Sequence, residues 1–296
     1  MKRPAAPPAV VYRWDLDKTY LRTEFTTLRQ LLRTALETGE DKVEVPGVAE
    51  LVKALRAAGE RGGRRVGIYF LSASPPQIGK AIRDKLALDG VPYDGIVFKN
   101  QLQHLRPGKL HNLREHVGYK LVELLRGRLE SPPGAREVLF GDDWESDSLI
   151  YSLYADLLAG RLEVRRLGPI LRRLRVDPQL SEQATVLASR AAGTDAVERI
   201  FINLERRTPP AIFQLFGPRV VPTFNYFQTA AVLAAAGHLA AAEVARVAQA
   251  LAERAAYTPR RLENSLDDLV RRGHLTGDAA DTLARPLRAA GVLPPE

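Results

Sequence analysis

The sequence predicts an α/β protein, with a parallel sheet covered by helices on both faces, followed by an all-helical C-terminal part. Up to about residue 180, short apolar runs alternate with segments of helical periodicity, which is typical of strands joined by crossover helices. Beyond that point the chain becomes rich in alanine and the alternation stops. Acidic or hydroxyl residues follow the strongest apolar runs, where the strands of such a sheet would end.

The elements of the first part follow one another as strands and helices. The first strand is VVYRW (residues 10–14), rich in the β-branched and aromatic residues that favour strands. A helix that begins at Pro46 ends before two glycines, the usual punctuation of a helix. Further strands are expected over residues 64–72, 95–100 and 135–142, with a weaker one over 162–168. Further helices are expected over residues 25–40, 75–90, 114–131 and 147–162.

The last part of the chain has a different texture. Alanine-rich segments of helical pattern fill residues 181–296, without strand alternation of comparable strength. We place a boundary near the arginine-rich segment 165–181 and expect an α/β domain over residues 1–180. Residues 181–296 would then form an all-helical domain, through which the protein could form an oligomer.

Composition excludes several classes of protein. A chain of 296 residues with 45% hydrophobic content is globular, and without cysteine it has no disulfide framework and no thiol chemistry. Prolines interrupt the basic start MKRPAAPPAVVY before any apolar run typical of a secretory leader. The longest low-charge stretch, residues 229–242, is too short to span a bilayer. We therefore expect a soluble, cytoplasmic protein.

The positive charge is concentrated in the first part of the chain. Of the net charge of +8, residues 1–180 carry +7 and residues 181–296 carry +1. Such a field favours anionic partners, whether phosphates, nucleic acid or an acidic membrane surface. A solvated basic surface without a partner is the alternative interpretation.

Polar residues end the three strongest strands. DLDKT (residues 15–19) ends the first, LSAS ends the second at Ser72, and GDDWESD (residues 141–147) ends the third. Because the carboxyl ends of parallel strands lie on one edge, these tips can converge on one crevice. Carboxylates suit Mg²⁺, and a serine ahead of a helix start can hold a phosphate. With an aspartate as nucleophile and a cation to balance the oxyanions, this set predicts phosphoryl transfer.

The motifs, taken in order, resemble those of the haloacid dehalogenase (HAD) superfamily. DLDKT, the strand into Ser72, a later lysine and GDDWESD are spaced 57, 48 and 22 residues apart. More narrowly, VPGVAELVKAL, YFLSASPPQI, YKLVELL and FGDDWESD are similar to the catalytic domain of actin-patch-type phosphatidate phosphatases. The resemblance implies a Rossmann-like sheet and a Mg²⁺-dependent phosphomonoesterase that forms a phosphoaspartate. The sequence departs from the family at Asp143 and Trp144, where small residues are usual.

This resemblance assigns roles to the acidic residues. Asp15 would be the nucleophile and a Mg²⁺ ligand. Asp17 would protonate the leaving oxygen and then activate water, with its backbone carbonyl facing the metal. Asp142 would complete the metal site, with Asp147 or Asp143 as a further ligand or an outer acceptor. Outside such a motif set, aspartates after a strand are more often turn or cap residues.

The resemblance also assigns the phosphate-binding groups. Ser72 and the backbone after it, starting at Ala73, would hold the phosphoryl oxygens, although a serine there is equally a helix-cap candidate. Thr19 would fix the loop beside the phosphate. Lys120 would neutralise both Asp15 and the transferring phosphate. The alternatives to this lysine are Lys99 and Lys109.

The two segments in which HAD enzymes often insert a cap domain contain few expected helices and strands in this sequence. Residues 20–64 and 75–118 hold too few expected elements for a full cap, so we expect a minimal cap and an open crevice. An open crevice favours a large substrate, such as a phosphoprotein, a nucleic-acid end or a lipid headgroup. Alternatively, the C-terminal helices or a second subunit cover the opening.

Two other classes of function stay open. The chain could be an anion-binding module for nucleic acid or a membrane surface, with hydrolysis secondary, or a scaffold assembled through its C-terminal helices. The first of these rests on a cluster of six arginines, namely Arg161, Arg165, Arg166, Arg172, Arg173 and Arg175. The five histidines are scattered without the spacing of metal ligands.

Overall fold

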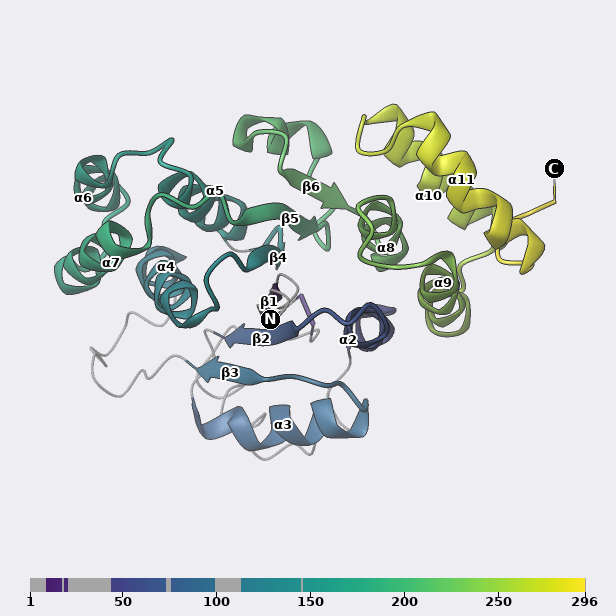
Figure 1. Ribbon diagram of the computed structural model, residues 1–296, viewed down its shortest axis with the longest axis horizontal. Coiled ribbons are helices and arrows are strands. Elements are labelled where there is room, and N and C mark those ends of the chain that lie inside the picture. The colour runs from purple at the N-terminus through teal and green to yellow at the C-terminus, as the bar shows by residue number, and fades with distance from the viewer. Residues whose placement is uncertain are drawn as a thin grey trace, which may run out of the picture.

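The computed structural model describes residues 9–17, 19–20, 44–72, 76–98, 113–144 and 146–295. Its described strands form one sheet of six strands in the order β3-β2-β1-β4-β5-β6, and every pairing is parallel (Figure 1). The strands are β1 (Val10–Asp15), β2 (Val66–Ser72), β3 (Gly95–Phe98), β4 (Arg136–Asp142), β5 (Val197–Asn203) and β6 (Val220–Thr223).

The strand order reverses between β1 and β4, which places a crevice at their carboxyl ends. From β1 the chain adds β2 and β3 on one side, and β4, β5 and β6 follow on the other. Asp15 pairs with Leu71 of β2, and Asp142 pairs with Asn203 of β5, so the strand tips stand at one edge. In open α/β sheets, ligands bind at this kind of switch point. We refer to this edge as the catalytic edge.

Helices cover both faces of the sheet, and each face has its own hydrophobic core. Trp14 belongs to the core on one face, and Leu139 to the core on the other. The first face is covered by α2 (Val48–Arg61), α3 (Gly79–Leu88), α8 (Tyr226–Ala235), α9 (Ala241–Ala255), α10 (Pro259–Arg271) and α11 (Gly277–Ala289). The second face is covered by α4 (Leu113–Glu130), α5 (Asp147–Leu158), α6 (Val164–Arg173), α7 (Pro178–Ala191) and the 3₁₀ helix η4 (Pro210–Phe216). Among the described helices, none combines the length and the apolar character needed to cross a bilayer.

The predicted α/β class, a Rossmann-like sheet accompanied by a helical region, is confirmed. The expectation that everything after residue 180 is helical is wrong, because β5 and β6 extend the sheet there. Both are short strands enclosed by alanine-rich helices, so their apolar residues merged with the helical pattern of their neighbours. The weak strand expected over residues 162–168 is also wrong. Those residues enter α6, where Leu167 and Leu171 are buried four positions apart, at helical spacing.

Several predicted features lie outside the described residues. The helix expected over residues 25–40 is one, and the last two residues of the strand expected over 95–100 are another. The boundary expected at residue 180 falls inside α7. Trp14 of β1, Leu51 of α2, Phe227 of α8 and Leu287 of α11 share one core, so the C-terminal helices pack with the sheet.

We expect a chain that ends at residue 180 to fail to fold. It would lose β5 from the edge of β4 and would expose the core that Phe201, Val221 and Phe227 complete. The measurement is thermal unfolding followed by circular dichroism, where the truncated chain should show no cooperative transition. The matched control is a chain that ends at Leu293, which keeps every described helix and strand. Cooperative unfolding of the 180-residue chain would contradict a core shared across that boundary.

Candidate active site

Asp15 stands at the carboxyl end of β1, with its side chain fully buried. The chain then turns back: the Leu16 N–H donates to the Leu71 carbonyl at 2.9 Å, and the Tyr20 N–H donates to the Leu16 carbonyl at 3.1 Å. The turn brings the hydroxyl of buried Thr19 to 3.4 Å from Asp15 Oδ2. Asp15, Leu16, Asp17 and Thr19 are therefore the buried residues of a turn that holds the Asp15 carboxylate at the catalytic edge.

Ser72 ends β2 beside this turn. Its hydroxyl donates to Asp17 Oδ2 at 2.8 Å, and both side chains are buried. The Tyr119 hydroxyl of α4 donates to the Ser72 carbonyl at 3.3 Å. The structure thus brings Ser72 and Asp17 together, although 55 residues separate them along the chain.

Lys120 reaches the site from α4, and its ammonium lies between two carboxylates. Nζ is 2.7 Å from Asp15 Oδ1 and 2.6 Å from Asp147 Oδ1, and all three side chains are fully buried. Such a pairing stabilises charges that would be costly to bury alone. Tyr151 of α5 lies nearby, and its pKa is raised well above the ordinary value by burial and then by the charge of Asp147. Its phenol is therefore neutral at any physiological pH.

Three carboxylates from three elements meet at this point. Ligand oxygens of Asp15, Asp142 and Asp147 all lie within 4.8 Å of one another, and all three residues are buried. Carboxylates gathered this closely around one ammonium favour the binding of a cation among them. Because carboxylate oxygens are the ligands that Mg²⁺ prefers, this donor set fits Mg²⁺. Histidines take no part in this group, as far as the described residues show.

Gly141 allows the Asp147 side chain to lie against the tip of β4. A Cβ at position 141 would lie 2.5 Å from Asp147 Oδ2, closer than side chains tolerate. The same carboxylate oxygen accepts the Asp142 N–H at 3.3 Å. Gly141 and Asp142 at the end of β4 thus hold the carboxylate of Asp147, the first residue of α5, against the strand tip.

Asp143, expected among the metal residues, lies outside the three-carboxylate group. Its Oδ1 accepts the Arg206 N–H at 2.9 Å, and its Oδ2 accepts the Thr208 N–H at 3.0 Å. The carboxylate therefore fastens the loop after β5, and Asp147 takes the place beside Asp15 and Asp142. Asp17, which is expected to face the metal through its backbone carbonyl, has its carboxylate outside the group, where it accepts the Ser72 hydrogen bond.

Residues of the C-terminal part also approach the site, and the sequence did not predict them. Asn203 pairs with Asp142 in the sheet and donates from Nδ2 to Glu205 Oε1 at 3.2 Å. The Tyr226 hydroxyl donates to the Thr19 carbonyl at 2.6 Å. The pKa of Tyr226 is raised by burial and then by the charge of Glu205. The sequence signal was NLERR at a strand end, which was hidden once that segment was interpreted as helix.

Three other predicted residues lie outside the described part of the chain. They are Ala73, expected to bind phosphate through its backbone, and the alternative lysines Lys99 and Lys109.

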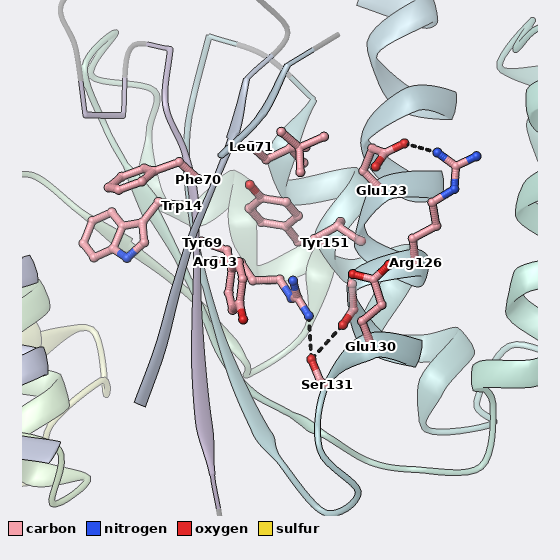
Figure 2. Close-up of a pocket in the computed structure, with 13 residues that line it drawn as sticks. Arg13, Trp14, Tyr69, Phe70, Leu71, Glu123, Arg126, Glu130, Ser131 and Tyr151 are labelled. Carbon is pink, nitrogen blue, oxygen red and sulfur yellow. Dashed lines mark hydrogen bonds and ion pairs between the residues drawn. The ribbon is translucent and has the colours of Figure 1, made fainter. Parts of the chain in front are cut away.

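A cavity of about 220 Å³ lies between α4 and strands β1 to β3 (Figure 2). Arg13 donates to the Ser131 hydroxyl at 3.0 Å and pairs with Glu137 at 3.2 Å, while Tyr69 and Tyr151 form part of the wall. The cavity contains none of the predicted catalytic side chains. Tyr151 is its link to the site, since the charges of Asp147 and Lys120 act on that phenol.

We expect Gly141→Ala to weaken binding of a divalent cation. The new methyl group would displace the Asp147 carboxylate, and such disturbance around metal ligands lowers affinity by about 10–100-fold. Calorimetric titration with Mn²⁺ measures the effect. Gly277→Ala is the matched control, because a Cβ there meets nothing within 4 Å. Equal Mn²⁺ affinity in both variants would contradict a role for Asp147 in binding the cation.

Comparison with known proteins agrees with this geometry. No curated protein matches the chain. The family model described as "Phosphatidate phosphatase APP1, catalytic domain" matches residues 14–164, slightly more than half of the 296-residue chain. The match includes Asp15, Ser72, Lys120 and the GDDWESD segment, and it ends inside α6. The chain therefore belongs to this family of HAD-like phosphatases, which are phosphoric monoester hydrolases.

Proposed function

We propose that the protein is a Mg²⁺-dependent phosphatase that forms an aspartyl-phosphate on Asp15 and acts on phosphatidate or a closely related lipid phosphate. The observation that carries the proposal is the placement of Lys120 between Asp15 and Asp147, in a group of three buried carboxylates. The substrate class follows from the name of the matching family, which is phosphatidate phosphatase.

The phosphoryl group would be held by residues from two sides of Asp15. Ser72 stands at the tip of β2, where its hydroxyl can turn from Asp17 toward a phosphoryl oxygen. The Lys120 ammonium, already 2.7 Å from Asp15 Oδ1, would face the same oxygens from α4. Fixed cationic and hydrogen-bonding groups of this kind stabilise the charge that develops during phosphoryl transfer.

In the first step, a carboxylate oxygen of Asp15 attacks phosphorus, and the bond between phosphorus and the ester oxygen breaks. Asp17 donates a proton to that leaving oxygen, so the alcohol departs neutral. Asp17 lies two residues after Asp15 in the same buried turn, and this position beside the nucleophile supports its role in proton transfer. When bound by Asp15, Asp142 and Asp147, Mg²⁺ would supply a positive charge for the phosphoryl oxygens.

In the second step, Asp17 accepts a proton from water as the water oxygen attacks phosphorus. The bond between phosphorus and Asp15 breaks, inorganic phosphate leaves, and the Asp15 carboxylate is restored for the next turnover. One pair of aspartates two positions apart therefore accounts for both halves of the reaction.

A second function, binding of an anionic polymer or surface, has one observation in its favour. α6 buries Leu167 and Leu171 and presents arginines to solvent. Together, α6 and the residues that flank it carry six exposed arginines, namely Arg161, Arg165, Arg166, Arg172, Arg173 and Arg175. Binding that falls with added salt and survives Asp15→Asn would be the signature of this second function.

We expect Asp15→Asn to abolish phosphate release, with a loss on the order of 10³-fold or more, because the nucleophile is removed. EDTA should abolish it as well, and Mg²⁺ should restore it. The measurement is phosphate release from an aryl phosphate, sugar phosphates, a phosphopeptide, a 3′-phosphorylated oligonucleotide and phosphatidate. The matched control is Asp281→Asn, at an exposed aspartate of α11. Turnover by Asp15→Asn that equals the control would contradict the mechanism, and a preference for another ester would contradict the lipid assignment.

We expect Asp17→Asn to trap the phosphoenzyme. An aryl phosphate has a leaving group that needs little protonation, so Asp15 can still be phosphorylated while hydrolysis of the acyl phosphate is slowed. Protein mass spectrometry after rapid acid quenching should then show one added phosphoryl group. The double variant Asp15→Asn/Asp17→Asn should remain unmodified. A phosphorylated double variant would place the acceptor elsewhere.

A further inference from the structure

Two exposed aromatic side chains stand at the catalytic edge, beyond the carboxylates. Trp144 follows the tip of β4 and is 42% exposed, and Phe224 follows the tip of β6 and is 41% exposed. Each has a guanidinium over its ring: Arg206 at 5.0 Å from the Trp144 centroid, and Arg272 at 5.5 Å from the Phe224 centroid. Both rings lie at the edge of the sheet that carries the active site, and exposed apolar surface gathered at one place is typical of an interaction site.

Trp144 is held firmly in this exposed position. Its N–H donates to Asp142 Oδ1 at 2.7 Å, so its backbone is tied to a residue of the carboxylate group. Asp143 fastens the loop that carries Arg206 by accepting the Arg206 N–H and the Thr208 N–H. The two residues that depart from the family pattern, Asp143 and Trp144, therefore build one structure at the tips of β4 and β5.

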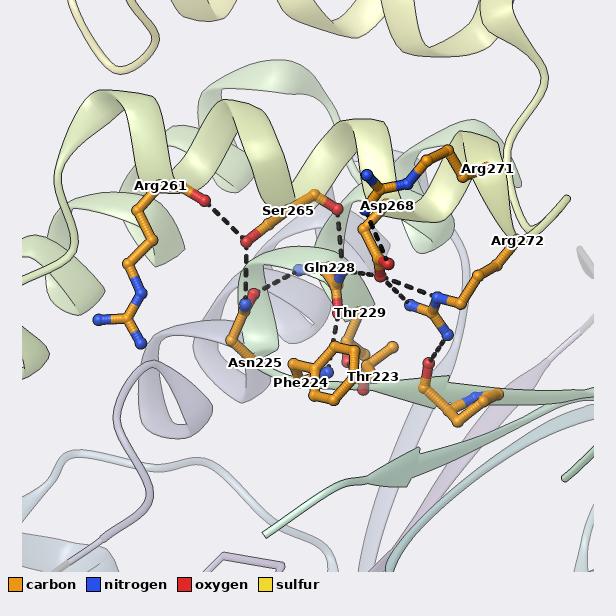
Figure 3. A network of polar contacts seen from close by, with 11 residues as sticks. Thr223, Phe224, Asn225, Gln228, Thr229, Arg261, Ser265, Asp268, Arg271 and Arg272 are labelled. Carbon is orange, nitrogen blue, oxygen red and sulfur yellow. Dashed lines mark hydrogen bonds and ion pairs between the residues drawn. The ribbon is translucent and has the colours of Figure 1, made fainter. Parts of the chain in front are cut away.

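Phe224 is supported by an independent network, which Figure 3 shows. Its N–H donates to Gln228 Oε1 at 2.8 Å, and Gln228 Nε2 donates to Asp268 Oδ2 of α10 at 2.9 Å. Arg272, which lies over the ring, also donates to the Pro222 carbonyl of β6 at 2.6 Å. The ring therefore projects from a fixed backbone.

Free positive charge accompanies the two rings. Arg206 and Arg207 are consecutive and exposed in the loop after β5, between the tips of β4 and β6 in the sheet order. Neither forms an ion pair within the described residues, whereas Arg272 is paired with Asp268. We call Trp144, Arg206, Arg207 and Phe224 the tip patch. It combines aromatic rings with arginines at the same edge of the sheet as Asp15.

We propose that the tip patch docks the enzyme on the surface of an anionic lipid bilayer, with the two rings in the interface and the two arginines on lipid phosphates. Aromatic side chains favour the boundary between headgroups and hydrocarbon, and exposed arginines are attracted to anionic lipids. The inference rests on the proposed lipid substrate, and it places Asp15 toward the membrane in which that substrate lies. A surface is the partner that fits best, because the four residues are spread over the tips of β4, β5 and β6.

The test is sedimentation of the full chain with phosphatidylcholine vesicles, with and without phosphatidylserine. Neither lipid is a phosphomonoester, so binding is measured apart from hydrolysis, and turnover of a soluble aryl phosphate reports separately on the proposed function. We expect binding to the anionic vesicles that weakens with added salt. Arg206→Gln/Arg207→Gln and Phe224→Ser should each lower the affinity about tenfold or more. Leu88→Ser should not, because Leu88 is 60% exposed at the end of α3, away from the strand tips.

Tryptophan fluorescence is a second measurement, which reports on the position of Trp144 without depending on a change in affinity. The chain has only two tryptophans, and Trp14 is fully buried against Phe140 at a centroid distance of 3.7 Å. Emission should therefore shift to the blue on adding anionic vesicles, and Trp144→Phe should remove the shift. The proposal would be overturned if the protein did not bind the vesicles or if the tip-patch variants bound as well as the unmodified chain. It would also be overturned if binding were lost in Arg172→Gln/Arg173→Gln instead. Equal binding to an oligonucleotide, lost in the same variants, would also overturn it.

Discussion

The buried ion pairs of Lys120 are the interaction on which the rest of the site depends. An uncompensated carboxylate or ammonium inside a protein is strongly destabilising, so Asp15, Asp147 and Lys120 can be fully buried only together. Lys120 reaches Asp15 at the tip of β1 from α4, so the site depends on the position of that helix. Gly118 lies two residues before it, and the absence of a side chain there lets Val176 and Leu180 approach, since a Cβ would lie 2.5 Å from Val176. The position of α4 is thus fixed from both sides.

The second half of the sheet supports the site residues that the sequence motifs supply. β5 covers the outer edge of β4, and Asn203 stands beside Asp142. Tyr226, the first residue of α8, donates to the carbonyl of Thr19 and so joins the C-terminal helices to the turn after Asp15. The family match ends at residue 164, yet the segments that support the phosphatase site continue to the core residues of α11. The remainder of the chain is therefore part of the fold that positions Asp15.

Much of the fold and the site followed from the sequence, because strand tips carry their chemistry in short local motifs. Asp15, Ser72 and Asp142 each end a strand whose apolar run is easily recognised, and parallel topology then brings the three together. The choice between Asp143 and Asp147 could not be made this way, because it depends on the close approach of Asp147 to Gly141. The strands β5 and β6 were missed for a related reason. Short buried strands and buried helix segments have the same apolar composition. Only their place in the sheet, with β5 paired to β4 and β6 paired to β5, distinguishes them.

The proposed mechanism requires Asp15, Asp142 and Asp147 together to hold one divalent cation beside Lys120. The most direct measurement is a crystal structure of the protein with Mn²⁺, with anomalous diffraction recorded at the manganese edge. We expect one strong peak among the three carboxylates, with Lys120 still in contact with Asp15. A peak on Asp143, or no peak at this group in crystals of protein that hydrolyses phosphate esters in the presence of Mn²⁺, would contradict it.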